Sequence, residues 1–195
     1  MNKHAEKMPV TLAAALLVAG YGAGAPSANA DTSMAKADAA GEPELLAQAE
    51  LEPTAGNEAR GKVKFSKAAG AVVIDGRVLG LTPGPHGFHI HEKGDCSAPD
   101  GTSAGGHFNP DGDPHGPPDS APDQHHVGDL GNIVASEDGI ALIRVVSSEM
   151  TLDDGPKSVL GRAVIVHSGP DDFETQPTGA AGSRVACGVI TAVKE

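Results

Sequence analysis

The stretch from Gly87 to Asp129 limits most strongly what this chain can fold into. It contains six of the nine histidines and one of the two cysteines, but almost no large apolar residues. Hydrophobic burial alone therefore cannot fix its conformation. A polar segment of this length inside a compact domain is uncommon unless it is functional or cross-linked. Metal coordination and a disulfide are the two constraints that its residues offer.

Short segments of alternating apolar residues surround this stretch and predict an all-β domain. The chain has no tryptophan, one tyrosine, 26 glycines and 15 prolines, which suits short strands and tight turns better than long helices. We expect strands at residues 49–53, 61–65, 71–81, 88–91, 130–135, 140–146, 161–166 and 186–193. This pattern is typical of an eight-stranded antiparallel sandwich or closed barrel. The polar stretches 87–129 and 167–184 would then be two long functional loops.

Residues 1–30 have the pattern of a secretory signal peptide. Lys3 and Lys7 precede an apolar run at 12–19, and Ala-Asn-Ala at 28–30 suits a cleavage site. A membrane anchor is disfavoured, because the run is shorter than the ~20 residues that a spanning helix needs. We expect residues 31–48 to be a flexible lead-in and 49–195 to be one domain. The protein would be exported, to a periplasm or beyond the cell, where disulfides persist.

The acidic composition excludes two classes of partner. The chain has 14 Lys and Arg against 26 Asp and Glu, a formal net charge of −12. Removal of residues 1–30 would take away two lysines and one glutamate and leave −13. Such a surface repels phosphate backbones and anionic headgroups, so we expect no nucleic acid and no membrane as a partner of the mature protein.

The histidines have spacings that suit metal ions. His89 and His91 stand two residues apart on a predicted strand, so both rings can face the same side. Three imidazoles and one carboxylate suit tetrahedral Zn²⁺ and are available from His107, His115, His126 and Asp129. Four imidazoles suit Cu²⁺ and are available from His89, His91, His107 and His167. A doubly deprotonated His107 could serve both ions, but spacing alone does not choose between His125 and His126.

Five blocks, in this order, resemble the signature blocks of the copper/zinc superoxide dismutases. They are GFHIHE, GGHFNP, HVGDLGN, GRAVIVH and GSRVACGVI. The resemblance covers about residues 49–194 and is to the exported bacterial type. It implies a Greek-key β-barrel that holds one copper and one zinc ion per subunit in the two ligand sets above. It also implies that the substrate is superoxide, the products are dioxygen and hydrogen peroxide, and His126 rather than His125 binds zinc.

The resemblance assigns roles to two residues outside the ligand sets. Arg184 would lie at the rim of the copper channel and attract the substrate anion, although an isolated arginine is more often an ion-pair partner. Asp171 would link the copper ligand His89 to the zinc ligand His115, although an isolated loop aspartate is more often solvated. His86, next to the first block, is expected to pack or hydrogen-bond beneath the site.

Cys96 and Cys187 are the only cysteines, so one intramolecular pairing exists. Two free thiols are the alternative, but an exported chain favours the disulfide. By the resemblance it would tie the long loop to the last strand.

Two rival functions use the same residues differently. One is a non-enzymatic copper or zinc buffer on the same barrel, and the other is a structural domain stabilised by zinc alone. The presence of both His167 and Arg184 favours the enzyme. Because the blocks mix features of different branches of the family, the sequence leaves a monomer and a homodimer as open alternatives.

Overall fold

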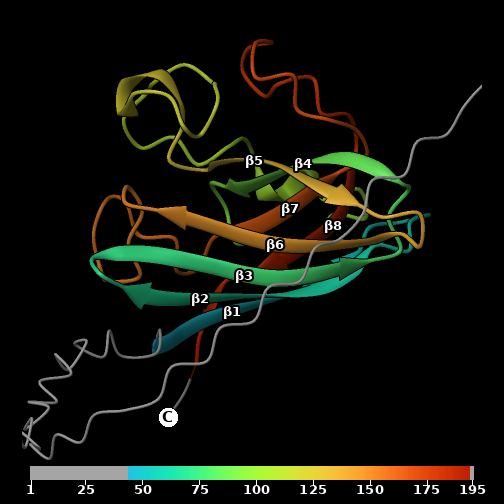
Figure 1. The fold of residues 1–195 in the computed structure, drawn as a ribbon, viewed down its shortest axis with the longest axis horizontal. Coiled ribbons are helices and arrows are strands. Elements are labelled where there is room, and N and C mark those ends of the chain that lie inside the picture. The colour runs from blue at the N-terminus through green and yellow to red at the C-terminus, as the bar shows by residue number, and fades with distance from the viewer. Residues whose placement is uncertain (1–43, 194–195) are drawn as a thin grey trace, which may run out of the picture. The chain divides into compact units, whose positions relative to one another are not determined.

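The computed structural model describes residues 44–193, and these form an all-β domain (Figure 1). The predicted signal peptide (1–30) and most of the predicted lead-in lie outside the described residues. The strands are β1 (Glu44–Pro53), β2 (Arg60–Ala68), β3 (Ala71–Leu79), β4 (Gly84–His91), β5 (Asp129–Ala135), β6 (Ile140–Ser147), β7 (Ala163–His167), β8 (Arg184–Val189) and β9 (Thr191–Ala192). Two short 3-10 helices, η1 (Thr102–Ala104) and η2 (Pro122–Gln124), lie in the long loop. Within this described part, no helix has the length and hydrophobicity needed to cross a bilayer.

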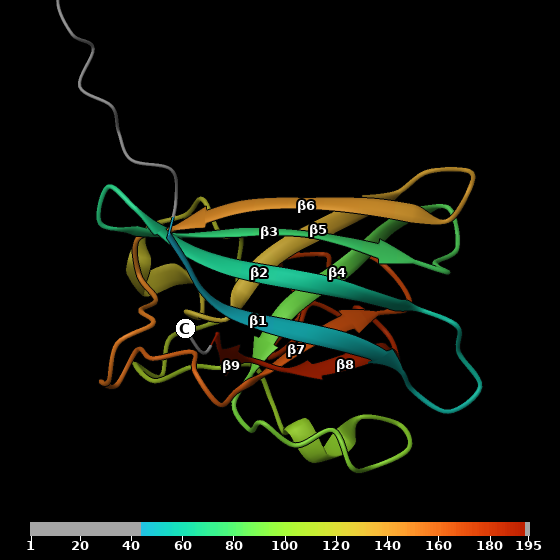
Figure 2. The same cartoon turned by 90° about the horizontal axis from the view of Figure 1, so that it is seen from below.

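Antiparallel pairing closes the sheet into a barrel. The strand order is β2-β3-β6-β5-β4-β7-β8-β1, and β1 also pairs with β2, which completes the circle. The short β9 follows β8 and pairs with β1 as well. The connections from β3 to β4 and from β6 to β7 each pass over two strands, which is Greek-key topology. Figure 2 shows β6, β3, β2 and β1 side by side on one wall of the barrel. The predicted eight-stranded antiparallel barrel is confirmed.

Strand alternation separates the core from the histidines. On β4, Phe88 and Ile90 are fully buried and belong to the main hydrophobic core. Successive residues of a strand face opposite sides, so His89 and His91 point away from the core. Burying an apolar side chain of this size contributes about 1.5–3 kcal/mol to folding. The core thus holds rigid the strand that carries the two histidines.

The first strand begins earlier than predicted. Residues 44–48 belong to β1, not to a flexible lead-in, because β2 also extends to Ala68 and offers them partners. A register shift between Leu45 and Ala47 keeps Ala47 and Ala49 buried on the inner face. The boundary at residue 48 was therefore wrong.

Turn residues shorten or divide three other predicted strands. Gly80 has φ of 76° and ends β3 at Leu79, and Gly161 has φ of 74° and lies in the turn before β7. Ile190 bonds to Gly161 and Arg162, which separates β8 from β9. β4 begins four residues earlier than expected, because Gly84 to Gly87 pair with β5.

The predicted disulfide is confirmed. Cys96 and Cys187 are bonded, with their Cα atoms 5.8 Å apart, and they join the loop after β4 to β8. Ala104, Ala163 and Ile165 pack with Cys187 in a small apolar cluster separate from the main core. This cluster fixes the first half of the long loop against the barrel wall.

We expect the double variant Cys96→Ser/Cys187→Ser to unfold with a free energy about 2–5 kcal/mol lower than the wild type. The bond closes a separation of 91 residues, so its loss frees a large unfolded ensemble. Urea unfolding would measure the difference, with reduced wild type as the control. An unchanged midpoint in both samples would contradict this role.

Candidate metal centre

The predicted ligand residues meet outside the barrel. β4 supplies His89 and His91, His167 ends β7, and Asp129 begins β5. The long loop brings three more histidines over these strands. The residues form two groups, and within each group one donor atom from each residue lies within 4.8 Å of the others. The first group is His89, His91, His107 and His167, and the second is His107, His115, His126 and Asp129. All seven residues are buried, and His107 belongs to both groups.

Backbone pairing sets the long loop in register with β4. His107 forms an isolated β-bridge with His91. The N–H of Phe108 donates to the carbonyl of Ile90, and the N–H of Ile90 donates to the carbonyl of Gly128. A Cβ on Gly128 would overlap the Ile90 carbonyl and lie 2.9 Å from the Phe108 nitrogen, so the close approach requires glycine. These bonds position His107 at the centre of the site.

Asp171 joins the two groups. Its Oδ2 lies 2.7 Å from His89 Nε2, and its Oδ1 lies 2.9 Å from His115 Nε2. The backbone of Asp171 is held at both ends by Asn132, whose Oδ1 accepts from the Asp171 N–H and whose Nδ2 donates to the Asp171 carbonyl. The carboxylate orients one ring of each group and turns the Nδ1 atom of each ring toward the centre.

Asp129 organises the group that contains it. Its Oδ1 lies 2.7 Å from His107 Nδ1, and its Oδ2 accepts from the backbone N–H groups of His126 and Gly116 at 2.9 and 3.2 Å. The Nδ1 atoms of His115 and His126 also lie 3.0 and 3.3 Å from this carboxylate, but without hydrogen-bonding orientation.

Two further ring nitrogens are anchored by backbone carbonyls. His91 Nδ1 lies 2.9 Å from the Gly105 carbonyl, and His167 Nδ1 lies 3.2 Å from that of Gly182. On the opposite sides of the rings, six buried nitrogens have no hydrogen-bond partner: His89 Nδ1, His91 Nε2, His107 Nε2, His115 Nδ1, His126 Nδ1 and His167 Nε2. Metal-bound histidines typically donate their second N–H to a carbonyl or carboxylate. Orphaned buried nitrogens are costly, so these residues fit metal ions.

The two carboxylates are stabilised as anions. Burial would raise the pKa of Asp129, but the three histidines around its carboxylate, led by the hydrogen-bonded His107, outweigh it and hold that pKa well below its usual range. Burial likewise opposes the change at Asp171, where bonds to His115 and His89 hold the pKa below its usual range. Negative charge is thus maintained in a buried site, as cation binding requires.

Three of the histidines are held neutral. Burial lowers the pKa of His107 to about 4 and that of His167 to about 3, and it lowers the pKa of His91 well below its ordinary value. His115 differs. Burial would lower its pKa, but the two carboxylates beside it, Asp129 at 3.0 Å and the hydrogen-bonded Asp171, outweigh this and raise it to about 9. A metal ion binding there would have to displace that proton.

Arg184 begins β8 beside the group of four histidines that contains His91 and His167. Its Nη1 donates to the carbonyl of Gly101 at 2.6 Å, and its Nη2 donates to that of Gly105 at 2.5 Å. The same Gly105 carbonyl lies 2.9 Å from His91 Nδ1. Burial lowers the pKa of Arg184, and Asp100 opposes this change, but arginine stays charged in proteins. A fixed cation therefore stands next to the group.

The other histidines lie outside the two groups. His86 is buried, with its ring nitrogens 2.7 Å from the His167 carbonyl and 2.8 Å from that of Thr82, so it supports the site as expected. His125 faces Glu149 instead, with Nε2 3.1 Å from Oε1. The structure thus brings His126, and not its neighbour, into the second group.

Sequence reasoning missed three supporting residues. Asn132 holds Asp171, and it lies within the HVGDLGN block, which could have pointed to it. Gln176 bonds to both backbone groups of His115 at 2.8 Å, and nothing in its local sequence indicates this. Gly179 leaves room for the contact between Asp171 and His115.

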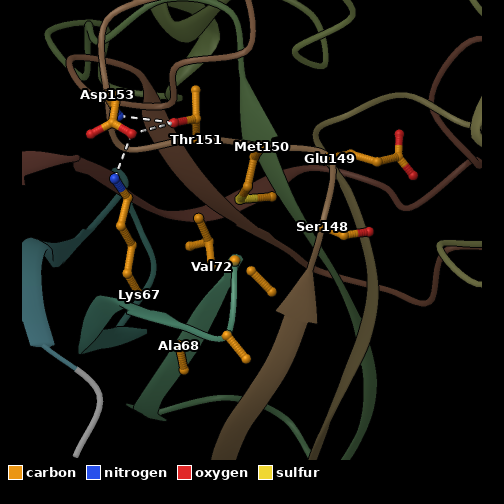
Figure 3. Close-up of a pocket in the computed structure, with 11 residues that line it drawn as sticks. Lys67, Ala68, Val72, Ser148, Glu149, Met150, Thr151 and Asp153 are labelled. Carbon is orange, nitrogen blue, oxygen red and sulfur yellow. Dashed lines mark hydrogen bonds and ion pairs between the residues drawn. The ribbon is translucent and has the colours of Figure 1, made fainter. Parts of the chain in front are cut away.

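A pocket elsewhere on the domain contains none of the residues of the two histidine groups. It has a volume of about 470 Å³ and lies between the β2–β3 hairpin and the segment after β6 (Figure 3). Its charged residues include Lys67 and Asp153, which form an exposed ion pair. The pocket offers no cluster of ligands comparable to the histidine groups.

Fold and site together define a Greek-key barrel protein with a two-part, histidine-rich metal centre. The family model described as copper/zinc superoxide dismutase (SODC) matches residues 59–190. The chain belongs to the copper/zinc superoxide dismutase family, as its sequence blocks predict. It is similar to the clock protein EA4, for which there is a crystal structure. The two sequences are 40% identical, the match covers 77% of this chain and 96% of the EA4 chain, and the structures superpose with a TM-score of 0.69.

Gly179→Ala should weaken metal binding by the group that contains Asp129, with Zn²⁺ as the probe, about 10- to 100-fold, the range typical when an outer contact of a metal ligand is lost. Gly179 has φ of 65°, and a Cβ there would overlap the Asp171 carboxylate and lie 2.6 Å from His115 Nε2. Competition with a chelator would measure the affinity. Gly70→Ala is the control, because Gly70 has φ of 82° with open space around it. Equal losses in both variants would attribute the effect to backbone strain alone.

Proposed function

We propose that this protein catalyses the dismutation of superoxide to dioxygen and hydrogen peroxide with one copper and one zinc ion per subunit. Copper would be held by His89, His91, His107 and His167, and zinc by His107, His115, His126 and Asp129. The main support is the set of six orphaned buried nitrogens around two adjacent points. When bound, copper supplies a one-electron redox couple, and zinc supplies charge without redox chemistry.

His107 is the residue that can couple proton transfer to this reaction. Its Nδ1 faces the group that contains Asp129, and its Nε2 is buried without a partner on the other side. Its ring centroid lies 4.0 Å from that of His89, so Nε2 is close to the proposed copper ligands. Nε2 would hold a proton beside the proposed copper ligands and donate it to a superoxide that is being reduced, which leaves as hydrogen peroxide after gaining a second proton from solvent.

Arg184 would bind and orient the substrate anion. Its guanidinium is held by two backbone carbonyls and keeps a positive charge in a protein with a net charge of −12. A fixed cation in an otherwise acidic surface attracts a small anion to one place. Enzymes of this family are themselves a standard example of such steering.

The reaction would take place outside the cytoplasm, in a periplasm, and would protect against superoxide there. The Cys96–Cys187 disulfide is compatible with an exported protein. The pattern of residues 1–30 supports the same proposal from a part of the chain outside the described residues.

We expect the mature domain loaded with copper and zinc to consume superoxide rapidly, and the zinc-only protein to be inactive. Turnover should fall as salt is added, because salt screens the attraction by Arg184. His167→Ala should lose copper and nearly all turnover but keep zinc, since His167 belongs to one group only. Stopped-flow decay of superoxide, with metal analysis of each sample, would measure this. Tight binding of both metals without turnover would instead support a metal buffer.

A further inference from the structure

His125 is a buried histidine that the proposed reaction does not use. It adjoins His126, and its Nδ1 lies 3.0 Å from the His126 carbonyl. Its Nε2 lies 3.1 Å from Oε1 of Glu149, in the segment after β6, as a close charge contact without hydrogen-bonding orientation. The side chains are 6% and 18% exposed, respectively. Both ring nitrogens of His125 therefore face oxygen acceptors in a nearly dry environment.

The carbonyl that His125 contacts belongs to the turn that carries two proposed zinc ligands. The same His126 carbonyl accepts from the Asp129 N–H at 3.0 Å, and the His126 N–H donates to Asp129 Oδ2 at 2.9 Å. The turn is closed by its own bonds, and its Gly128 carbonyl accepts from the Ile90 N–H of β4. The contact between His125 and Glu149 adds a link to the segment after β6.

Glu149 is anchored on its own side. The segment that follows it is fixed in the main core by Met150 and Leu152, both buried. A second link runs from this segment to the long loop, where Lys157 lies 2.7 Å from Asp111. Figure 3 shows the Glu149 carboxylate directed away from the Lys67–Asp153 pair. The carboxylate thus projects from a rigid support toward the zinc half of the site.

Stability alone does not explain this carboxylate. Its Oε2 is buried and has no hydrogen-bond partner among the described residues. An unpaired buried carboxylate oxygen is unfavourable, and a buried polar group of this kind requires a reason other than packing.

We propose that Glu149, acting through His125, is a positioning residue for the zinc site. It would fix the backbone of His126 and so the direction of its Nδ1. This inference rests on the proposed zinc ligation. Outer contacts of metal ligands commonly change metal affinity 10- to 100-fold, and we expect the lower end of this range, because Glu149 acts through one intermediate residue.

The test uses Glu149→Gln, which keeps the shape of the side chain and removes its charge. Zinc affinity should fall about tenfold. The visible absorption bands of Co²⁺ bound in the zinc site should shift, because the ligand field changes with the direction of His126. Copper affinity should stay as in the wild type. Asp153→Asn is the matched control, since Asp153 lies in the same segment but pairs with exposed Lys67.

A double-variant cycle separates positioning from general stability. Glu149→Gln/His125→Gln should lose no more zinc affinity than His125→Gln alone, because the two residues act in series. Additive losses, or a Co²⁺ spectrum unchanged in Glu149→Gln, would overturn the proposal. If Glu149→Gln does not fold, a wild-type Co²⁺ spectrum in His125→Gln would overturn it equally. Failure of the wild type to bind zinc would instead reject the proposed function.

Discussion

Two buried carboxylates, Asp129 and Asp171, hold together loops that have few large apolar residues of their own. Asp171 comes from the loop after β7 and contacts one histidine on β4 and one in the long loop. Asp129 begins β5 and accepts hydrogen bonds from the long loop at two backbone positions. The histidines around them keep both groups ionised although they are buried. A polar, charged core thus replaces a hydrophobic one in this part of the protein.

The hydrophobic core of the barrel offsets the free-energy cost of burying these charged groups. Its core includes Phe65, Phe88 and Ile90, all fully buried, and it holds β4 in place independently of the loop contacts. The outer face of the same strand then presents His89 and His91 in fixed directions. The disulfide ties the opposite end of the site, next to Arg184, to the long loop. Stability and chemistry therefore use different faces of the same strands.

The strands could be predicted because alternation reports burial directly. Their limits could not, because a limit depends on a partner strand distant in the sequence. β1 begins at Glu44 only because β2 extends far enough to pair with it. Turn glycines such as Gly80 and Gly161 were visible in the sequence, but their positive φ values were not.

The candidate metal centre likewise has parts that the sequence predicts and parts that it does not. The sequence blocks indicated the two ligand groups, which the structure brings together, because the types of donor and their spacing are local features. The supports of these ligands were not predictable. Gln176 contacts His115 across 61 residues, and Glu149 contacts His125 across the gap between two loops. Such contacts are formed by topology and leave no local pattern.

The proposed function depends on His107 joining two different metal ions in one site. The most direct measurement is a crystal structure of the copper- and zinc-loaded protein, with anomalous data collected at both absorption edges. We expect copper at the four-histidine group, zinc at the group with Asp129, and a ring nitrogen of His107 on each metal. One kind of metal at both positions, or a zinc ion bound by His125 in place of His126, would contradict it.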